Sequence, residues 1–162
     1  MIVVLLAVCL AFAAWSDWKR RKISNWLLFP MMATGLLYQL WTGQGLMALG
    51  GLTGGFVLTV VPVVLRAMGM GDQKLLMAAG VWLGFTEIYW LFLVSALLCV
   101  ASMLFLPQRL GLLGRHLFIL AAGWRGHRKL WFPSYHQSAW SIPFAVFFFA
   151  AFLIRYGRWM PL

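Results

Sequence analysis

The sequence predicts an all-α fold, a membrane bundle of about six transmembrane helices that forms one domain over residues 1–162. Of the 162 residues, 64% are apolar and 10% are charged, whereas soluble domains average roughly 45–50% apolar and 25% charged residues. Such a chain cannot cover its apolar surface with polar side chains. Because a spanning helix needs about 20 mostly apolar residues, about six of them would use most of the chain.

Six apolar runs are the candidates for these helices. They cover residues 1–16, 24–41, 46–65, 74–86, 88–106 and 139–156, and the fourth is the shortest. A secretory signal peptide carries its positive charge before its apolar stretch. Here the basic residues Lys19, Arg20, Arg21 and Lys22 follow the first run, so we expect a retained helix.

The third run contains Gly50, Gly51, Gly54 and Gly55, which form two overlapping G-x-x-x-G spacings. Small residues at this spacing let another helix backbone approach closely. We expect them to pack against another helix of the same chain rather than to form a dimer, and the sequence does not predict an oligomeric state.

The basic residues predict how the chain crosses the membrane. They follow the first, third and fifth runs, whereas the gaps after the second and fourth runs lack lysine and arginine. The positive-inside rule then places the basic gaps in the cytoplasm and both chain ends outside. Arg155 and Arg158 do not fit, so they lie either at the outer headgroups or on a re-entrant last run.

The formal charge of +10 predicts contact with anionic lipid headgroups rather than nucleic acid, because the basic residues stand in short clusters between apolar runs. Residues 107–138 are too charged to span and indicate an interfacial amphipathic segment. The spacing of His116, His127 and His136 matches no metal site. Cys9 and Cys99 lie inside apolar runs and are expected to pack, so neither metal nor cofactor is expected.

The chain has three acidic residues, Asp17, Asp72 and Glu87. The predicted topology places Asp17 and Asp72 at the cytoplasmic ends of their helices and Glu87 on the opposite side, where we expect a solvated turn residue. An ionisable side chain at the membrane boundary is costly unless it is paired or hydrated, so it indicates function. We therefore expect Asp17 and Asp72 to lie together.

Two adjacent carboxyl groups share one proton, because the first negative charge opposes the second. One group can then accept a proton from water while the other polarises a peptide carbonyl, as in aspartic proteases. Structural roles remain open as well, since Asp17 could pair with the following basic residues and Asp72 could cap a helix. Gly69 and Gly71 permit a backbone geometry or a close approach that a side chain would block.

The segment Gly69-Met70-Gly71-Asp72-Gln73-Lys74 resembles the G-x-G-D-x-K signature of type IV prepilin peptidases, which are membrane aspartyl proteases. Asp17 with Ile23 and Asn25 is similar to the family's first-aspartate segment, D-x-x-x-x-x-I-P-N, although Ser24 replaces the proline. The segment Ser141-Ile142-Pro143-Phe144 resembles a later proline-containing segment of the family.

This resemblance implies that Asp17 and Asp72 are the catalytic pair and that Gly69, Gly71, Lys74 and Asn25 belong to the motif or contact the substrate. It implies prepilin or pseudopilin substrates, cut after a basic leader ending in glycine at the cytoplasmic face of a bacterial inner membrane. The chain looks like the short form found with tight-adherence (Flp) pili, which lacks a methyltransferase region. The role of Lys74 stays open among tuning Asp72, contacting substrate and extending to the interface.

Two other functions remain open. An intramembrane protease of the presenilin type also carries a G-x-G-D motif, but it usually shows a Tyr-Asp pair and a Pro-Ala-Leu motif, whereas Ser16 precedes Asp17 here and no Pro-Ala-Leu occurs. A proton-linked transporter or assembly subunit would also place carboxylates in the membrane, but no polar stripe crosses several of the predicted helices.

Overall fold

The computed structural model describes residues 2–20, 22–65, 68–104 and 143–157, and these ranges contain six α-helices. The helices are α1 (Ile2–Arg20), α2 (Asn25–Trp41), α3 (Gly45–Val64), α4 (Met70–Leu83), α5 (Phe85–Leu104) and α7 (Phe144–Tyr156). Three helical segments are long and apolar enough to cross a membrane, namely α1, α3 and Phe85–Ser102 of α5. The predicted all-α membrane bundle is therefore confirmed.

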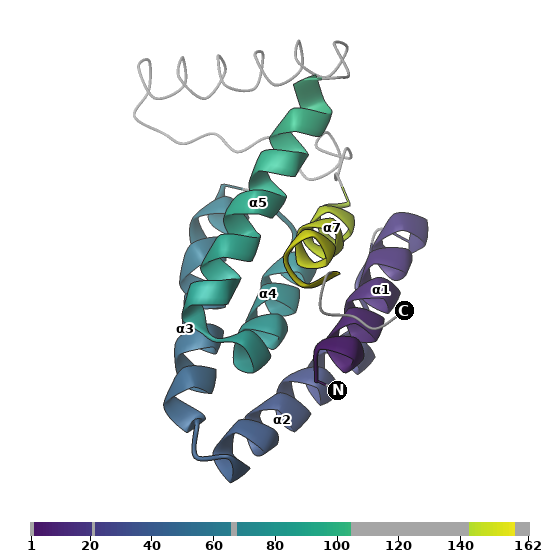
Figure 1. The fold of residues 1–162 in the computed structure, drawn as a ribbon. Coiled ribbons are helices and arrows are strands. Elements are labelled where there is room, and N and C mark those ends of the chain that lie inside the picture. Colours follow the sequence, from purple (N-terminus) through teal and green to yellow (C-terminus); the bar gives the residue numbers. More distant parts are fainter. Residues whose placement is uncertain (1, 21, 66–67, 105–142, 158–162) are drawn as a thin grey trace.

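Successive helices run in alternating directions, so the helix termini gather at two ends of the bundle (Figure 1). One end holds the C-terminus of α1 and the N-termini of α2, α4 and α7, and we call it the aspartate end because Asp17 and Asp72 lie there. The opposite end holds the turn from α4 to α5 and the C-terminus of α7. We call it the glutamate end after Glu87.

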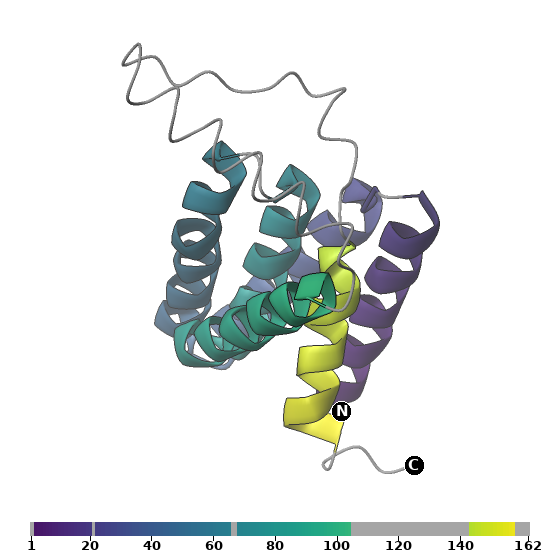
Figure 2. The same cartoon turned by 90° about the horizontal axis from the view of Figure 1, so that it is seen from above.

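Helix α4 lies at the centre of the bundle, where it contacts α2, α3, α5 and α7 (Figure 2). Every residue from Ala78 to Leu83 is buried, as are Leu75 and Leu76. The helix has 14 residues, which span about 21 Å at about 1.5 Å per residue, less than the roughly 30 Å of a bilayer core. Its neighbours enclose it, so α4 does not have to match the membrane thickness by itself.

Glycines bring α3 and α4 into backbone contact. A Cβ atom on Gly51 would clash with the carbonyl group of Gly80, and one on Gly55 would lie 2.9 Å from the backbone carbonyl of Leu76. A Cβ atom on Gly54 would clash with the ring of Phe85. Packing within the chain is thereby confirmed for these three glycines, whereas the Cβ position of Gly50 meets no described atom within 4 Å.

The turn between α4 and α5 is made by Gly84, whose φ of 81° suits glycine. Glu87 lies beyond this turn, in the first turn of α5, and its side chain is only 27% exposed because it pairs with Arg155. The expectation of a solvated turn residue is wrong, because hydropathy places the break between helices at the charged residue whereas the backbone turns at the glycine.

Helix α7 extends from the aspartate end, where Ala145 contacts Asp17, to the glutamate end, where Arg155 contacts Glu87 (Figure 1). Arg155 therefore lies at the end opposite to Asp17, and the two alternatives for how the last run meets the membrane stay predictions. The predicted interfacial segment 107–138, together with its three histidines, lies outside the described residues, as do Ser141, Ile142 and Arg158.

Candidate active site

Asp17 lies in the last helical turns of α1, and its side chain is buried, with 6% exposure. Its Oδ2 atom accepts a hydrogen bond from the backbone N–H of Ala145, 3.3 Å away. Ala145 is the second residue of α7, and the first N–H groups of a helix have no partner within that helix. A carboxylate suits this place because the N-terminus of a helix carries partial positive charge. Asp17 is thus held between α1 and α7.

The chain between α1 and α2 is fixed next to this carboxyl group. The hydroxyl group of Ser16 donates a hydrogen bond to the backbone carbonyl of Lys22, with an Oγ–O distance of 2.9 Å. Helix α2 then starts after Ser24, whose backbone is extended and whose carbonyl accepts the N–H groups of Leu27 and Leu28. A serine therefore begins α2 where the resembled motif has proline.

Asp72 lies in the first turn of α4, and Gly69 is the N-cap residue of that helix. The Oδ2 atom of Asp72 accepts the backbone N–H of Gly69 at 3.3 Å, and the backbone N–H of Asp72 donates to the carbonyl of Gly69 at 3.1 Å. Reciprocal bonds of this kind close the first turn of a helix. The interpretation of Asp72 as the N-cap residue is wrong, because Gly69 takes that position and Asp72 follows three residues later, where its side chain accepts the N–H of the cap residue.

The two aspartates lie at the same end of the bundle, as predicted. They are close enough for the charge on Asp17 to act on Asp72. Asp17 lies on α1 and accepts a hydrogen bond from α7, and Asp72 lies on α4, so these three helices supply the groups of the candidate site. A pair of carboxyl groups in such a partly enclosed place can share one proton.

A left-handed backbone conformation does not explain the glycines at positions 69 and 71, because neither Gly69 nor Gly71 has a positive φ. Among the described glycines, a positive φ occurs only at Gly43 and Gly84. The Cβ position of Gly71 would lie 3.6 Å from the Cβ atom of Ile23, which is ordinary contact. The chain before α4 thus lies next to Ile23, which follows Asp17, but a Cβ atom on Gly71 would fit there, so an approach that requires glycine at these two positions stays a prediction.

Lys74 and Asn25 meet on another side of α4. The Nζ atom of Lys74 donates to Oδ1 of Asn25 at 3.1 Å and lies 5.6 Å from the ring centroid of Phe29. Residues 72 and 74 are separated by roughly 200° around a helix axis, since each residue turns the helix by about 100°. Lys74 thus joins α4 to α2 and points away from Asp72, and its predicted contact with substrate stays a prediction.

An open pocket of about 220 Å³ lies between α2, α3 and α4. Its lining is apolar apart from Gln73 and Lys74 and includes Phe29, Phe56 and Met77. Because Lys74 and Met77 lie roughly 200° and 140° around the helix from Asp72, this pocket is not the space between the two aspartates.

Ala145 is a residue of the site that sequence reasoning missed. It contributes a backbone N–H, which no residue type reveals, but Pro143 immediately before α7 is a signal for a helix N-terminus. Asp17 and this helix terminus are 128 residues apart in the sequence. Among the described residues, no three histidine, cysteine, aspartate or glutamate side chains form a group that could hold a metal ion.

Comparisons with known proteins identify the family of this chain. No match was found among curated proteins or among solved structures. The family model described as the type IV leader peptidase family matches residues 4–104, which is more than half of the 162-residue chain. The match includes both aspartates and helices α1 to α5. The chain therefore belongs to the type IV leader peptidase family, and it is a membrane protein of a family of peptidases.

Proposed function

We propose that this protein is an aspartyl endopeptidase that removes the leader peptide from prepilins or pseudopilins, with Asp17 and Asp72 as its catalytic pair. The observation that carries the proposal is that two of the three acidic side chains lie at one end of the bundle, near enough for the charge of one to act on the other. Membership of the leader peptidase family supports the choice of substrate.

In the proposed reaction the two carboxyl groups share one proton. The ionised group takes a proton from water, and the water oxygen attacks the carbonyl carbon of the scissile peptide bond while the protonated group donates to the carbonyl oxygen. Collapse of the tetrahedral intermediate breaks the C–N bond. The leaving nitrogen takes the proton that the first carboxyl group had accepted from water, and a hydroxyl proton of the intermediate returns to the second carboxylate, which restores the shared-proton pair. The backbone N–H groups of Ala145 and Gly69 support the proposal because they fix one oxygen of each carboxyl group.

We place this reaction at the cytoplasmic face of the inner membrane. The described basic residues Lys19, Arg20, Lys22 and Lys74 occur beside Asp17 or Asp72 in the sequence, and Lys74 bonds to the start of α2 at the aspartate end. Basic residues favour the cytoplasmic side of a membrane protein, which supports this orientation.

We further propose that residues 1–162 act as one peptidase domain. Helix α7 lies beyond the family match, yet its Ala145 N–H bonds to Asp17 and its phenylalanines pack into the common core. Within the domain, Lys74 and Asn25 hold α2 against α4, while Gly69 and Gly71 leave the backbone before α4 accessible to an extended substrate segment.

The test is cleavage by the purified protein in lipid nanodiscs. We expect removal of a leader-sized mass from a prepilin that has a basic leader ending in glycine before an apolar helix. Asp17→Asn and Asp72→Asn should each lower the cleavage rate by at least about 100-fold, because each removes a proton donor or acceptor from the reaction. Both variants should keep the helical content and elution volume of the parent protein.

The same experiment separates the alternatives. Cleavage within the apolar helix of the substrate would favour an intramembrane protease of the presenilin type, and ion uptake by proteoliposomes without leader removal would favour a transporter. Substantial cleavage by either well-folded asparagine variant would show that the aspartates are not the catalytic pair.

A further inference from the structure

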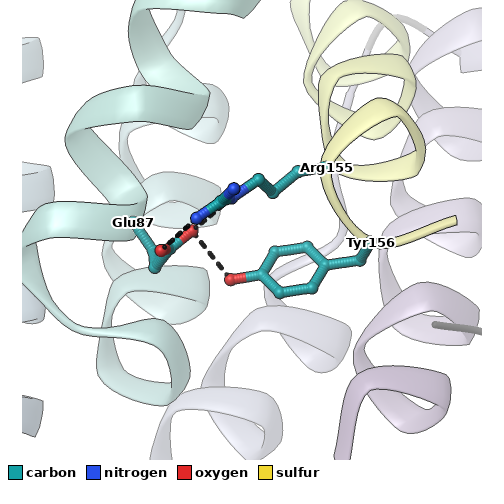
Figure 3. Close-up of polar contacts among 3 residues, drawn as sticks. All are labelled: Glu87, Arg155 and Tyr156. Carbon is teal, nitrogen blue, oxygen red and sulfur yellow. Dashed lines mark hydrogen bonds and ion pairs between the residues drawn. The ribbon is translucent and has the colours of Figure 1, made fainter. Parts of the chain in front are cut away.

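Among the described residues, the polar cluster at the glutamate end is the largest set of hydrogen bonds that join one side chain to another. Glu87 of α5 accepts two hydrogen bonds from the guanidinium group of Arg155, at 3.0 Å and 3.1 Å, and a third from the hydroxyl group of Tyr156 at 2.9 Å (Figure 3). Arg155 also lies over the ring of Trp90, 5.5 Å from its centroid. Arg155 and Tyr156 of α7 are thus hydrogen-bonded to the first turn of α5.

The hydrogen bonds between Arg155 and Glu87 fix how α7 is oriented relative to α5. An arginine that donates two parallel hydrogen bonds to one carboxylate fixes both distance and orientation. Because Arg155 and Tyr156 are consecutive, their bonds to Glu87 define how far α7 reaches along α5 as well as how it is rotated. The Glu87 side chain is 27% exposed and that of Arg155 is 49% exposed, so the cluster contributes geometry more than stability.

The apolar packing of α7 defines its axial position less sharply. Phe144, Phe148 and Phe152 recur every four residues and are buried, and Phe144 and Phe148 stack at 6.4 Å between centroids. Tyr156 continues this row. A shift of α7 by four residues, about 6 Å along its axis with a rotation of roughly 40°, would place one phenylalanine where another had been. The packing of these rings therefore differs little between axial positions of α7 that are four residues apart.

The axial position of α7 matters because its other end touches Asp17. The Ala145 N–H lies 3.3 Å from Oδ2 of Asp17, so a shift of an ångström along the axis would break this bond. Asp17 is also faced by Asp72 from α4, and Lys19 and Arg20 follow on its own helix. The bond from Ala145 favours the negative charge of Asp17 and fixes the direction of its carboxyl group.

We propose that Glu87, Arg155 and Tyr156 are positioning residues, which set the axial position of α7 and so hold the Ala145 N–H against the Asp17 carboxylate at the opposite end of the bundle. This inference rests on the proposed function, because it assigns the three residues to the geometry of the peptidase reaction. None of the three touches the substrate or the reacting atoms.

The experiment compares three single variants and one exchange in the prepilin cleavage assay over a range of pH. Glu87→Gln, Arg155→Gln and Tyr156→Phe each weaken the cluster with little change of shape. We expect the two charge variants to lower the rate by about tenfold, since misplacement of reacting groups by 1 Å can cost as much as about 100-fold. The acidic limb of their pH–rate profiles should move to higher pH, because Asp17 loses an N–H that favours its charge. Tyr156→Phe should show the same changes to a smaller extent.

The double variant Glu87→Arg with Arg155→Glu restores an ion pair with exchanged partners, and we expect it to recover much of the rate and the parent pH profile. A loss of folded protein alone would lower the rate without moving the pH profile, so the profile separates positioning from stability. If the single variants keep the parent profile, the positioning role is rejected while the Asp17 and Asp72 assignment stands. If the aspartate variants still cleave, the proposed function itself fails.

Discussion

The two ends of the bundle hold their acidic side chains in different surroundings. At the glutamate end, Glu87 is bonded to the guanidinium group of Arg155 and the hydroxyl group of Tyr156. At the aspartate end, Asp17 and Asp72 receive backbone N–H groups from Ala145 and Gly69, and the charge of Asp17 acts on Asp72. An arginine stays charged at any accessible pH and keeps its partner ionised, whereas neighbouring carboxyl groups can exchange a proton. The partner of an acidic side chain, rather than the acid itself, therefore separates a structural carboxylate from a candidate catalytic one.

The largest effect is expected when both aspartates are replaced together, which tests whether they share one proton. If Asp17 and Asp72 act as one unit, the double variant Asp17→Asn with Asp72→Asn should cleave no more slowly than either single variant, each about 100-fold or more below the parent. The reason is that loss of either group already ends the sharing of a proton. The measurement is the initial rate of prepilin cleavage at matched amounts of folded protein.

Independent roles would give a different result. If the two single losses multiplied in the double variant, the aspartates would contribute separately and the pair would not share a proton. The Glu87→Gln variant provides a second comparison, because it also replaces a carboxylate by an amide but at the opposite end, where we expect only the smaller change described above.

Two neighbouring glycines of α3 test the contact between α3 and the central helix α4. Gly51→Ala should lower the free energy of unfolding by about 1–3 kcal/mol, because the new Cβ atom would clash with the carbonyl group of Gly80 and force α3 from α4. Gly50→Ala is the matched control. Its Cβ position meets no described atom within 4 Å, and alanine favours a helix over glycine by roughly 0.5–1 kcal/mol, so this variant should be unchanged or slightly more stable.

Unfolding in a denaturing detergent, followed by circular dichroism, measures both glycine variants. Equal destabilisation by the two substitutions would contradict the described contact between α3 and α4. A Gly50→Ala variant that stays folded but dissociates on dilution would instead show that Gly50 packs against a second copy of the chain.

Much of the fold could be predicted because apolar length alone identifies helices that cross a membrane. The six predicted runs correspond to the six described helices, but their boundaries differ where polar chemistry extends a helix. Helix α1 continues from the predicted end at residue 16 to Arg20, and α4 starts at Met70 rather than residue 74, because Asp72 closes its first turn. Hydropathy cannot detect a helix that extends into the interface.

The candidate site was only partly predictable. The scarcity of acidic residues and the charge pattern placed Asp17 and Asp72 at one end, and the structure brings them together there. Neither signal revealed the Ala145 N–H or the pairing of Glu87 with Arg155, because both connect residues that are distant in the sequence. A backbone donor carries no side-chain signature, and an ion pair between distant helices becomes visible only after the helices are packed.

The smallest expected effect concerns the bond between Lys74 and Asn25, which lies on the face of α4 away from Asp72. Lys74→Met should lower the free energy of unfolding by about 0.5–1.5 kcal/mol, the usual contribution of one hydrogen bond, and change the cleavage rate by less than tenfold. Asn25→Ala should have a similar effect, and the double variant should add little, because both single variants remove the same 3.1 Å bond. A loss above about 100-fold in a folded Lys74→Met protein would be of the size expected for a proton donor or acceptor. Such a loss would give Lys74 a direct part in catalysis and extend the candidate site to the second face of α4.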